Sequence, residues 1–413
     1  MARDGTPVPA GTSWLRSRSH RDWLASETTR LLEFARRARV EDGFGYLDAD
    51  GAPDAGRARE LWIATRMTHV FALGELLGHP GSRPLVDHGL AAIGAFADRE
   101  HGGWFSEVER DGPARAAKEA YSHAFVLLAA ASATVAGHDD GRSLLDDAIS
   151  VVLERFWDEQ DGASVDVWDR RWSRPEDYRG ANANMHMLEA FLAVGDATGE
   201  PVWFARAEQI ATRFIDDVAR QHDWRVVEHF AGDWRPLPDY NADEPRHRFR
   251  PYGATPGHGL EWSRLVLQLR AALAAPPSWL EDAAAALFVR AVADGWAPPG
   301  GLVYTTDFRG HVVVPERLHW VIAEGIGAAA ALSATTGEGH YEWWYRTFWD
   351  FADVHLRDRE RGGWRHELDE RLAPAERTWS GKPDAYHALQ ATLLPRLPVA
   401  PSLAVAVRDG LLT

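Results

Sequence analysis

The sequence predicts an all-α protein in the form of an (α/α)6 barrel, and two observations support this fold class. A short segment rich in glycine and aromatic residues returns six times along the 413 residues, at intervals of roughly 60 to 70 residues. Between consecutive segments lie two stretches with the apolar periodicity of helices. Six helix pairs with no polar capping repeat favour a ring closed on itself over an open helical solenoid.

The six recurring segments share one kind of chemistry. Each combines glycines with alternating aromatic or β-branched residues and then Asp, Arg or Gly, as in "HGGWFSEVERDG" and "GGWRHELDERLAP". This pattern is typical of a short hairpin or an extended loop. The segments are therefore expected to connect the helix pairs, and they begin at residues 42, 101, 161, 231, 300 and 362.

The helical stretches are of two kinds. "GRSLLDDAISVVLERFWDE" carries its charges on one face and is expected to lie outside, whereas "SHAFVLLAAASATVAG" is apolar nearly all round and is expected to be buried inside. Alternation of the two kinds predicts six outer and six inner helices in one domain, residues 1–413, with a core of about 19–397. The twelve predicted helices span residues 19–40, 55–78, 81–98, 117–136, 140–158, 179–198, 201–221, 257–275, 277–297, 317–336, 339–358 and 384–395.

The composition narrows the classes of partner. The formal net charge of −16 argues against nucleic acid and anionic membranes, and no apolar run is long enough to span a bilayer. The absence of cysteine excludes disulfides and thiolate metal sites. The segment "MARDGTPVPAGTSW" lacks the apolar region of a secretion signal, so a cytoplasmic protein is expected. The expected oligomeric state is a monomer or a homodimer. The 19 tryptophans suggest platforms for sugar rings in addition to core residues.

Polar and aromatic residues gather near the starts of the predicted inner helices. In a barrel these helices run parallel, so their N-termini surround one mouth. A single histidine in an apolar helix is usually a core residue, but histidines that recur at this place predict a functional cleft. Arg66, within "LWIATRMTHVFALGELL", needs a partner or an anionic or polyol ligand if it is buried. The residues that gather at these starts are Trp62, Arg66, His69, Tyr121, His123, Asn182, Asn184, His186, His258, Glu261, Trp262, His319, Trp320, Glu324, Asp384, Tyr386 and His387.

Three kinds of chemistry fit such a mouth. His258 and Glu261 lie three residues apart on one helix face and could bind a metal, but no H-E-x-x-H pattern accompanies them. Glu261 and Glu324 could act as the paired carboxylates of a glycoside hydrolase. Histidines at helix N-termini favour a third kind, because the positive helix end disfavours imidazolium and leaves a neutral general base. Two such histidines suit the movement of a proton between adjacent carbons of a sugar.

Four motifs, taken in chain order, resemble the N-acylglucosamine 2-epimerase superfamily. They are "ELWIATRMTHVFAL", "RGANANMHMLEAF", "RPYGATPGHGLEWSRL" and "GKPDAYHALQATLLP". The resemblance covers about residues 19–397, nearly the whole chain. It implies a barrel of six α/α pairs and proton-transfer chemistry that needs no metal and no other cofactor.

The resemblance also implies roles for individual residues. The catalytic pair of histidines falls on His258 and His387, and the carboxylate beside the first falls on Glu261, which would orient His258 through its second ring nitrogen. The "RHRFRPYG" stretch leaves the choice among Arg246, Arg248 and Arg250 open, and the spacing from His258 favours Arg248. The sugar-contacting positions fall on Trp62, Arg66, Tyr121, Asn182, His186, Arg248 and Trp320.

The closing motif indicates the branch of the superfamily. "DAYHALQATLLP" resembles the aldose–ketose isomerases more than the 2-epimerases. The expected reaction is the interconversion of D-mannose and D-fructose through a cis-enediol(ate), with a monosaccharide as the one partner. The alternatives are isomerisation of sulfoquinovose, 2-epimerisation of cellobiose or N-acylglucosamine, glycoside hydrolysis on the same fold, and non-catalytic sugar binding.

Overall fold

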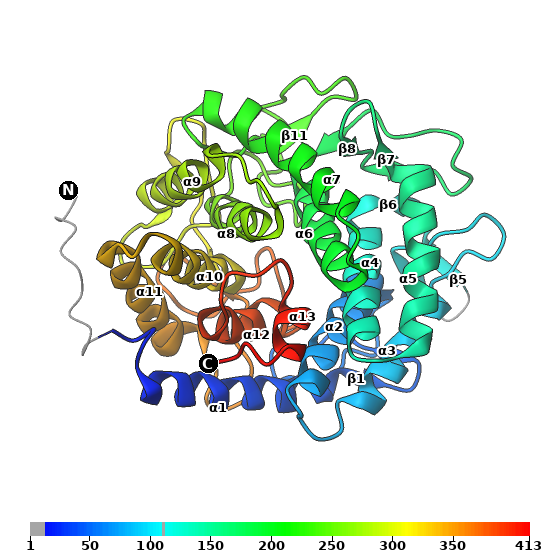
Figure 1. Ribbon diagram of the computed structural model, residues 1–413, viewed down its shortest axis with the longest axis horizontal. Helices are drawn as coiled ribbons and strands as arrows, with labels where there is room; N and C mark the ends of the chain where they lie inside the picture. The colour runs from blue at the N-terminus through cyan, green and yellow to red at the C-terminus, as the bar shows by residue number, and fades with distance from the viewer. Residues whose placement is uncertain (1–12, 110–111) are drawn as a thin grey trace.

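The computed structural model describes residues 13–109 and 112–413, and it confirms the predicted class as two concentric rings of helices (Figure 1). Residues 1–12, where no secretion signal is expected, and residues 110–111 of the second connecting segment lie outside the described residues. The inner ring contains α2 (Leu61–Leu76), α4 (Ala120–Val135), α6 (Ala181–Thr198), α8 (Pro256–Ala272), α10 (His319–Thr336) and α12 (Tyr386–Leu393). The outer ring contains α1 (Arg18–Ala35), α3 (Arg83–Ala95), α5 (Asp139–Val151), α7 (Val202–Ala211), α9 (Trp279–Gly295) and α11 (Gly339–Phe351).

The inner ring closes on itself. α2 packs against α4, each following inner helix packs against the next, and α12 returns to α2. The two kinds of helix differ in burial as their periodicity predicts. Every residue of α2 from Leu61 to Gly74 is buried, whereas α5 buries Gly141, Leu145 and Ala148. The core therefore lies inside the inner ring and between the two rings.

Five of the six inner helices begin later than predicted, and in four of them, α2, α4, α6 and α10, the reason is that the two preceding residues form a strand. α2 starts at Leu61 rather than at residue 55, and β3 directly precedes it and pairs with β4 of the next connecting segment. The same arrangement precedes α4, α6 and α10. The strands are β1 (Arg39–Val40), β2 (Gly43–Phe44), β3 (Arg59–Glu60), β4 (Glu107–Glu109), β5 (Gly112–Arg115), β6 (Lys118–Glu119), β7 (Trp157–Asp158), β8 (Ala163–Ser164), β9 (Val167–Trp168), β10 (Arg179–Gly180), β11 (His229–Phe230), β12 (Thr305–Thr306), β13 (Val312–Val314), β14 (Arg317–Leu318) and β15 (Glu367–Leu368).

Backbone hydrogen bonds tie each of these inner helices to the next connecting segment. The first N–H groups of a helix have no partner within the helix, and here they donate to the following repeat. The bonds run from Leu61 to Ser106 (2.9 Å), from Ala120 to Asp166 (2.8 Å), from Ala181 to Glu228 (2.9 Å) and from His319 to His366 (3.0 Å). The last repeat is joined to the first in a related way, because the Lys382 N–H donates to the Leu47 carbonyl at 2.8 Å.

The chain has two lysines, and both are buried at equivalent points of two repeats. Lys118 pairs with Asp98 at 3.0 Å, and Lys382 pairs with Asp358 at 2.7 Å. Each aspartate opens a D-R-E-x-G-G-W sequence and also accepts backbone N–H groups of that turn. These buried ion pairs therefore hold a connecting segment against the residues that lead into an inner helix.

The segment beyond residue 397, outside the predicted core, covers the far end of the inner ring. A thirteenth helix, α13 (Leu403–Arg408), packs against α2, α4 and α6. Ser402 donates to Asp196 at 2.7 Å, and the Gln268 amide donates to the Ala400 carbonyl at 3.0 Å. Because these partners lie near the C-terminal ends of α6 and α8, the N-terminal ends of the inner helices surround the opposite mouth, as predicted.

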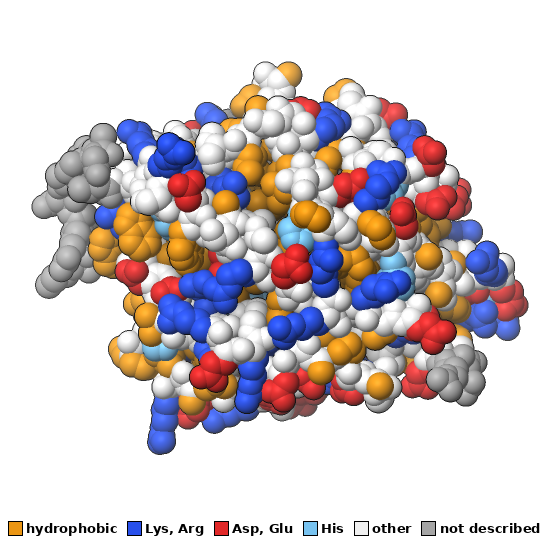
Figure 2. Space-filling model, turned by 90° about the horizontal axis from the view of Figure 1, so that it is seen from below, with side chains coloured by type: hydrophobic (Ala, Val, Ile, Leu, Met, Phe, Trp, Pro, Cys, Tyr) orange, Lys and Arg blue, Asp and Glu red, His pale blue; other side chains and the backbone are white. Residues whose placement is uncertain are grey.

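The outer surface carries charges of both signs. Figure 2 shows the barrel from below the view of Figure 1, and acidic and basic side chains are interspersed over that face. The net charge of −16 is therefore not gathered there into one acidic patch. Among the described residues, no helix combines the length and the apolar character that crossing a membrane requires.

We expect Lys382→Met to destabilise the fold, because it removes the buried cation 2.7 Å from the Asp358 carboxylate and leaves that carboxylate with the more exposed Arg365, 3.5 Å away. Loss of one partner of a buried ion pair costs about 3–5 kcal/mol, and the free energy of unfolding measured in urea should fall by that amount. Arg408→Met, at an exposed position, is the control and should change it by less than about 0.5 kcal/mol. An equally small effect of Lys382→Met would contradict the role given to this ion pair.

Candidate active site

The ten residues to which the resemblance gives catalytic or sugar-contacting roles all line one cavity at the N-terminal ends of the inner helices. They come from all six inner helices and from the segment before α8. A second cavity, beside α13 at the far end of the barrel, contains none of the ten. The ten are Trp62, Arg66, Tyr121, Asn182, His186, Arg248, His258, Glu261, Trp320 and His387, and the wall is completed by Phe249, Pro251, Tyr304, His319, His366, Trp379, Pro383 and Asp384.

His258 is held by a carboxylate from a connecting segment. Its Nδ1 lies 2.9 Å from both carboxylate oxygens of Glu228, the residue before β11. The prediction that Glu261 orients His258 is wrong, because the Glu261 carboxylate instead lies 3.8 Å from Nδ1 of His186 on α6. That prediction considered neighbours on the same helix and not the adjoining segment. Since a carboxylate accepts hydrogen bonds, Nδ1 carries the proton and Nε2 is free to accept one.

His387 is held in the same way by a carboxylate from a neighbouring helix. Its Nδ1 lies 3.2 Å from Glu324 Oε1 on α10. Burial lowers the pKa of His387, although the hydrogen bond with Glu324 opposes this shift. From the sequence, the positive end of the helix is expected to keep the imidazole neutral, whereas in the structure burial is the main cause of the lowered pKa of His387. His387 is therefore neutral near pH 7 with its Nδ1 occupied.

Trp320 lies between the two histidines. The centre of its ring system is 5.2 Å from the His258 ring and 5.9 Å from the His387 ring, at interplanar angles of 36° and 35°. Gly257 permits this approach, because a Cβ there would lie 2.4 Å from the indole. The Pro-Gly pair that opens α8 thus serves the packing of Trp320. Two imidazoles beside a flat apolar surface suit a bound sugar.

Arg66 has the partners that its burial requires. The guanidinium lies 3.3 Å from Asp384 Oδ2 and donates to the Tyr121 hydroxyl at 2.9 Å. Its central carbon is also 5.1 Å from the Trp62 ring and 4.4 Å from the Phe125 ring. A cation fixed in this way in a cavity wall can stabilise negative charge on a ligand oxygen.

The three arginines of "RHRFR" separate in the structure. Arg248 lines the cavity. Arg246 pairs instead with Glu316 at 3.2 Å, and Arg250 pairs with Glu176 at 2.8 Å. Neither of these two arginines belongs to the cavity wall. Arg248 is therefore the arginine placed to meet a ligand.

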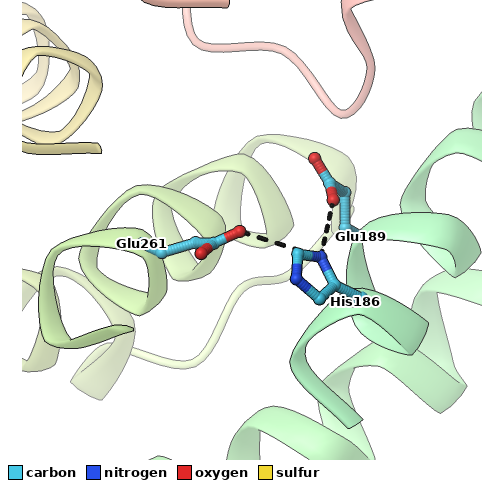
Figure 3. A group of neighbouring side chains, drawn as sticks. All are labelled: His186, Glu189 and Glu261. Carbon is cyan, nitrogen blue, oxygen red and sulfur yellow. Dashed lines mark hydrogen bonds and ion pairs between the residues drawn. The ribbon is translucent and has the colours of Figure 1, made fainter. Parts of the chain in front are cut away.

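His186, Glu189 and Glu261 form a group that could hold a metal ion, since their ligand atoms lie within 4.8 Å of one another (Figure 3). Burial lowers the pKa of His186 to about 4, although the hydrogen bond with Glu189 opposes it. Burial and the nearby Glu324 carboxylate raise the pKa of Glu261 well above its usual value. A histidine and two carboxylates match the ligand types of a divalent cation. However, the Arg264 guanidinium, 3.6 Å from Glu261, already supplies positive charge at this place.

Sequence reasoning missed Glu228 and His366, although the repeat contains the signal that marks them. Their carbonyls accept the first N–H groups of α6 and α10, and the Asp166 carbonyl does the same for α4. From this shared place, the Glu228 side chain reaches His258, and the His366 ring stacks on His319 with centroids 3.6 Å apart. Four connecting segments share this position, and in two of them its side chain contacts a histidine of the mouth.

Two histidines of the predicted mouth do not reach the cavity. His69 lies deeper, with Nδ1 2.7 Å from Ser132 Oγ. His123 accepts the Trp104 N–H at 3.2 Å. Both are core histidines. His319, by contrast, lines the cavity, and neither of its ring nitrogens has a hydrogen-bond partner among the described residues.

The chain is similar to known proteins over nearly its whole length. Residues 43–391 match the N-acylglucosamine 2-epimerase (GlcNAc 2-epimerase) family. A D-mannose isomerase of Thermobifida fusca is 53% identical over 402 residues, which cover 96% of this chain and 99% of that protein. A D-mannose isomerase of Pseudomonas cannabina pv. alisalensis is 50% identical over 403 residues, 96% of this chain and 97% of that protein. A crystal structure of a D-mannose isomerase has a TM-score of 0.85 at 29% identity and covers 91% of this chain and 97% of that chain.

The barrel, its mouth and these similarities agree on one class of protein. The chain belongs to the N-acylglucosamine 2-epimerase family, which confirms the resemblance drawn from the four motifs. Its similarity to named D-mannose isomerases, together with its membership of this family, shows that the chain is an isomerase.

We expect Glu228, and not Glu261, to set the tautomer of His258. NMR of the imidazole nitrogens in the ¹⁵N-labelled protein should show His258 protonated at Nδ1. In Glu228→Gln the partner is an amide that can donate as well as accept, so the signals should shift towards a mixture of tautomers. Glu261→Gln is the matched control and should leave the His258 signals in place. The reverse pattern in the two variants would refute the assignment.

Proposed function

We propose that this isomerase interconverts D-mannose and D-fructose. The observation that carries the proposal is the pair His258 and His387, each with Nδ1 held by a carboxylate and each close to Trp320 in one cavity. The names of the two similar D-mannose isomerases support the choice of sugar. The proposed catalytic unit is the whole barrel, and its one required partner is the monosaccharide.

The proposed reaction moves two protons on the open-chain sugar. One histidine, through Nε2, removes the proton from C2, and the released electrons form the C1–C2 double bond of a cis-enediol(ate). The other histidine protonates C1 or carries the hydroxyl proton from O2 to O1. In total, C2 and O2 each lose a proton while C1 and O1 each gain one, so the aldose becomes a 2-ketose. Positioned acid–base groups of this kind accelerate proton transfer by about 10²–10⁴-fold.

Cationic and neutral donors in the wall would stabilise the intermediate. We assign Arg66, Arg248 and His186 to hydrogen bonds with O1 and O2, where negative charge develops. Glu261 does not orient His258, but it lines the cavity, and its Oε1 has no hydrogen-bond partner among the described residues. Burial and the Glu324 carboxylate raise its pKa and so favour the neutral carboxylic acid, which can donate to a sugar hydroxyl. The proposed contacts to the rest of the sugar come from Trp62, Tyr121, Asn182 and Trp320.

The proposed reaction needs no metal, and one incubation tests both the reaction and this independence. The protein is mixed with D-mannose in D₂O, with and without EDTA, and followed by NMR. We expect fructose in both samples at the same rate, with deuterium entering at C1 or C2, because the histidines exchange protons with solvent. Loss of activity in EDTA would contradict the metal-free mechanism and direct attention to His186, Glu189 and Glu261.

The products also separate the proposal from its alternatives. Glucose as the main product, with deuterium at C2, would make the enzyme a 2-epimerase. If mannose stays unchanged and sulfoquinovose is converted, the substrate is the sulfonated sugar and not mannose. Turnover of neither sugar would leave a hydrolase or a sugar-binding protein.

We expect His258→Ala and His387→Ala each to lower kcat by at least about 10²-fold with a smaller change in KM, because each removes a proton carrier. His311→Ala, at an exposed position, is the control and should keep the wild-type kcat. Steady-state kinetics with D-mannose measures the effect. Wild-type activity in both cavity variants would show that these histidines do not carry the protons.

A further inference from the structure

A buried arginine lies between the cavity and the far end of the barrel. Arg264, on α8, is 2% exposed, and its Nε donates to Glu324 Oε2 at 2.9 Å. Its Nη2 is 3.6 Å from Glu261 Oε1 and 4.0 Å from Glu189 Oε1. Its Nη1 donates to the Gln268 side chain at 2.7 Å. Three side-chain carboxyl groups, those of Glu189, Glu261 and Glu324, therefore converge on this guanidinium.

Two of these carboxylates also hold histidines of the cavity. Glu324 binds Arg264 through Oε2, and its other oxygen, Oε1, is 3.2 Å from His387 Nδ1. Glu189 approaches Arg264 with Oε1, and its Oε2 is 3.3 Å from His186 Nδ1. Arg264 is therefore separated from each histidine by a single carboxylate.

The guanidinium favours the ionised form of Glu324, with which it shares its shortest contact to a carboxyl group. Burial opposes ionisation of Glu324, but Arg264 and the hydrogen bond with His387 outweigh burial and lower its pKa. Glu261 behaves in the opposite way, because burial and the Glu324 carboxylate raise its pKa well above the usual value. The charged and titratable groups that face this cluster and His387 are Arg66 and His69 on α2, His186 and Glu189 on α6, Glu261 on α8, His319 and Glu324 on α10, His366 before β15, Asp384 before α12, and Tyr386 and His387 on α12.

We propose that Arg264 is a positioning residue of the isomerase, which keeps Glu324 ionised and aligned so that Glu324 holds His387 with its Nε2 free for the sugar. Arg264 acts through Glu324 because it is not part of the cavity wall. A planar guanidinium suits this role, since separate N–H groups reach Glu324 and Gln268 at once. The inference rests on the proposed function, in which His387 exchanges a proton with the sugar.

The test compares Arg264→Gln with Arg357→Gln in the full chain, with D-mannose as substrate. Arg357 is the matched control, because it is buried and pairs with Glu27 at 2.5 Å but lies beside the outer helices α1 and α11. For Arg264→Gln we expect kcat to fall about 10–100-fold at similar KM. The acidic limb of the kcat–pH profile should also move to higher pH by about 1–3 units, because Glu324 without its cation is protonated more readily. Arg357→Gln should lower thermal stability and leave this limb in place.

Two outcomes would overturn the inference. One is an Arg264→Gln enzyme with wild-type kcat and pH profile. The other is an equal loss of kcat in both variants with no movement of the limb, which is the behaviour of a structural residue. If Arg264→Gln does not fold, Arg264→Lys decides, because it keeps the charge. Because the charge is kept, the acidic limb should stay in place, and a loss of kcat at unchanged KM that Arg357→Lys does not show supports the inference. Wild-type kcat, or an equal loss of kcat in Arg357→Lys, overturns it.

The same assay separates this inference from the proposed function. If wild-type protein fails to convert D-mannose, the proposed function fails before any substitution is made. If wild type converts D-mannose and His387→Ala does not, but Arg264→Gln matches wild type, the role of Arg264 fails and the proposed function stands.

Discussion

The backbone hydrogen bond between an inner helix and the next connecting segment is the contact on which the rest of the structure depends. The first N–H groups of a helix need acceptors outside that helix, and this barrel finds them in the neighbouring repeat. At Ala181 the acceptor is the Glu228 carbonyl, and at His319 it is the His366 carbonyl. The same bond that links two repeats therefore places a polar side chain at the mouth. Assembly of the ring and assembly of the site are consequences of one contact.

Charges that are costly to bury give the mouth its rigidity. Arg66 is fixed by Asp384, and Arg264 is fixed by the Glu324 carboxylate. A buried charge is tolerated when it is paired and hydrogen-bonded, and breaking such a pair is strongly unfavourable. Each proposed proton carrier is therefore oriented before the sugar binds. Glu228 orients His258, and Glu324 orients His387. Preorganised groups of this kind lose little free energy to rearrangement during the reaction.

The sequence predicts the fold well because periodicity and repetition are local signals. The two kinds of helix differ in burial as expected, and the resemblance drawn from the four motifs assigns roles to ten residues that lie in one cavity. The errors arise where a contact joins different repeats. The extended residues before Leu61 look helical in isolation, and Glu261 appears to be the partner of His258 because both lie on one helix face. Glu228 is thirty residues from His258 in the chain, so its role becomes visible with the connecting segment in place.

The most direct test of the account is a crystal structure with D-mannitol, an open-chain polyol that cannot isomerise. C1 and C2 should lie beside Trp320, with Nε2 of both His258 and His387 within hydrogen-bond reach of their hydroxyl groups, about 2.6–3.2 Å. A polyol whose C1 and C2 lie between Glu261 and Glu324, with both histidines out of reach, would contradict the assignment of these histidines as the groups that move the protons.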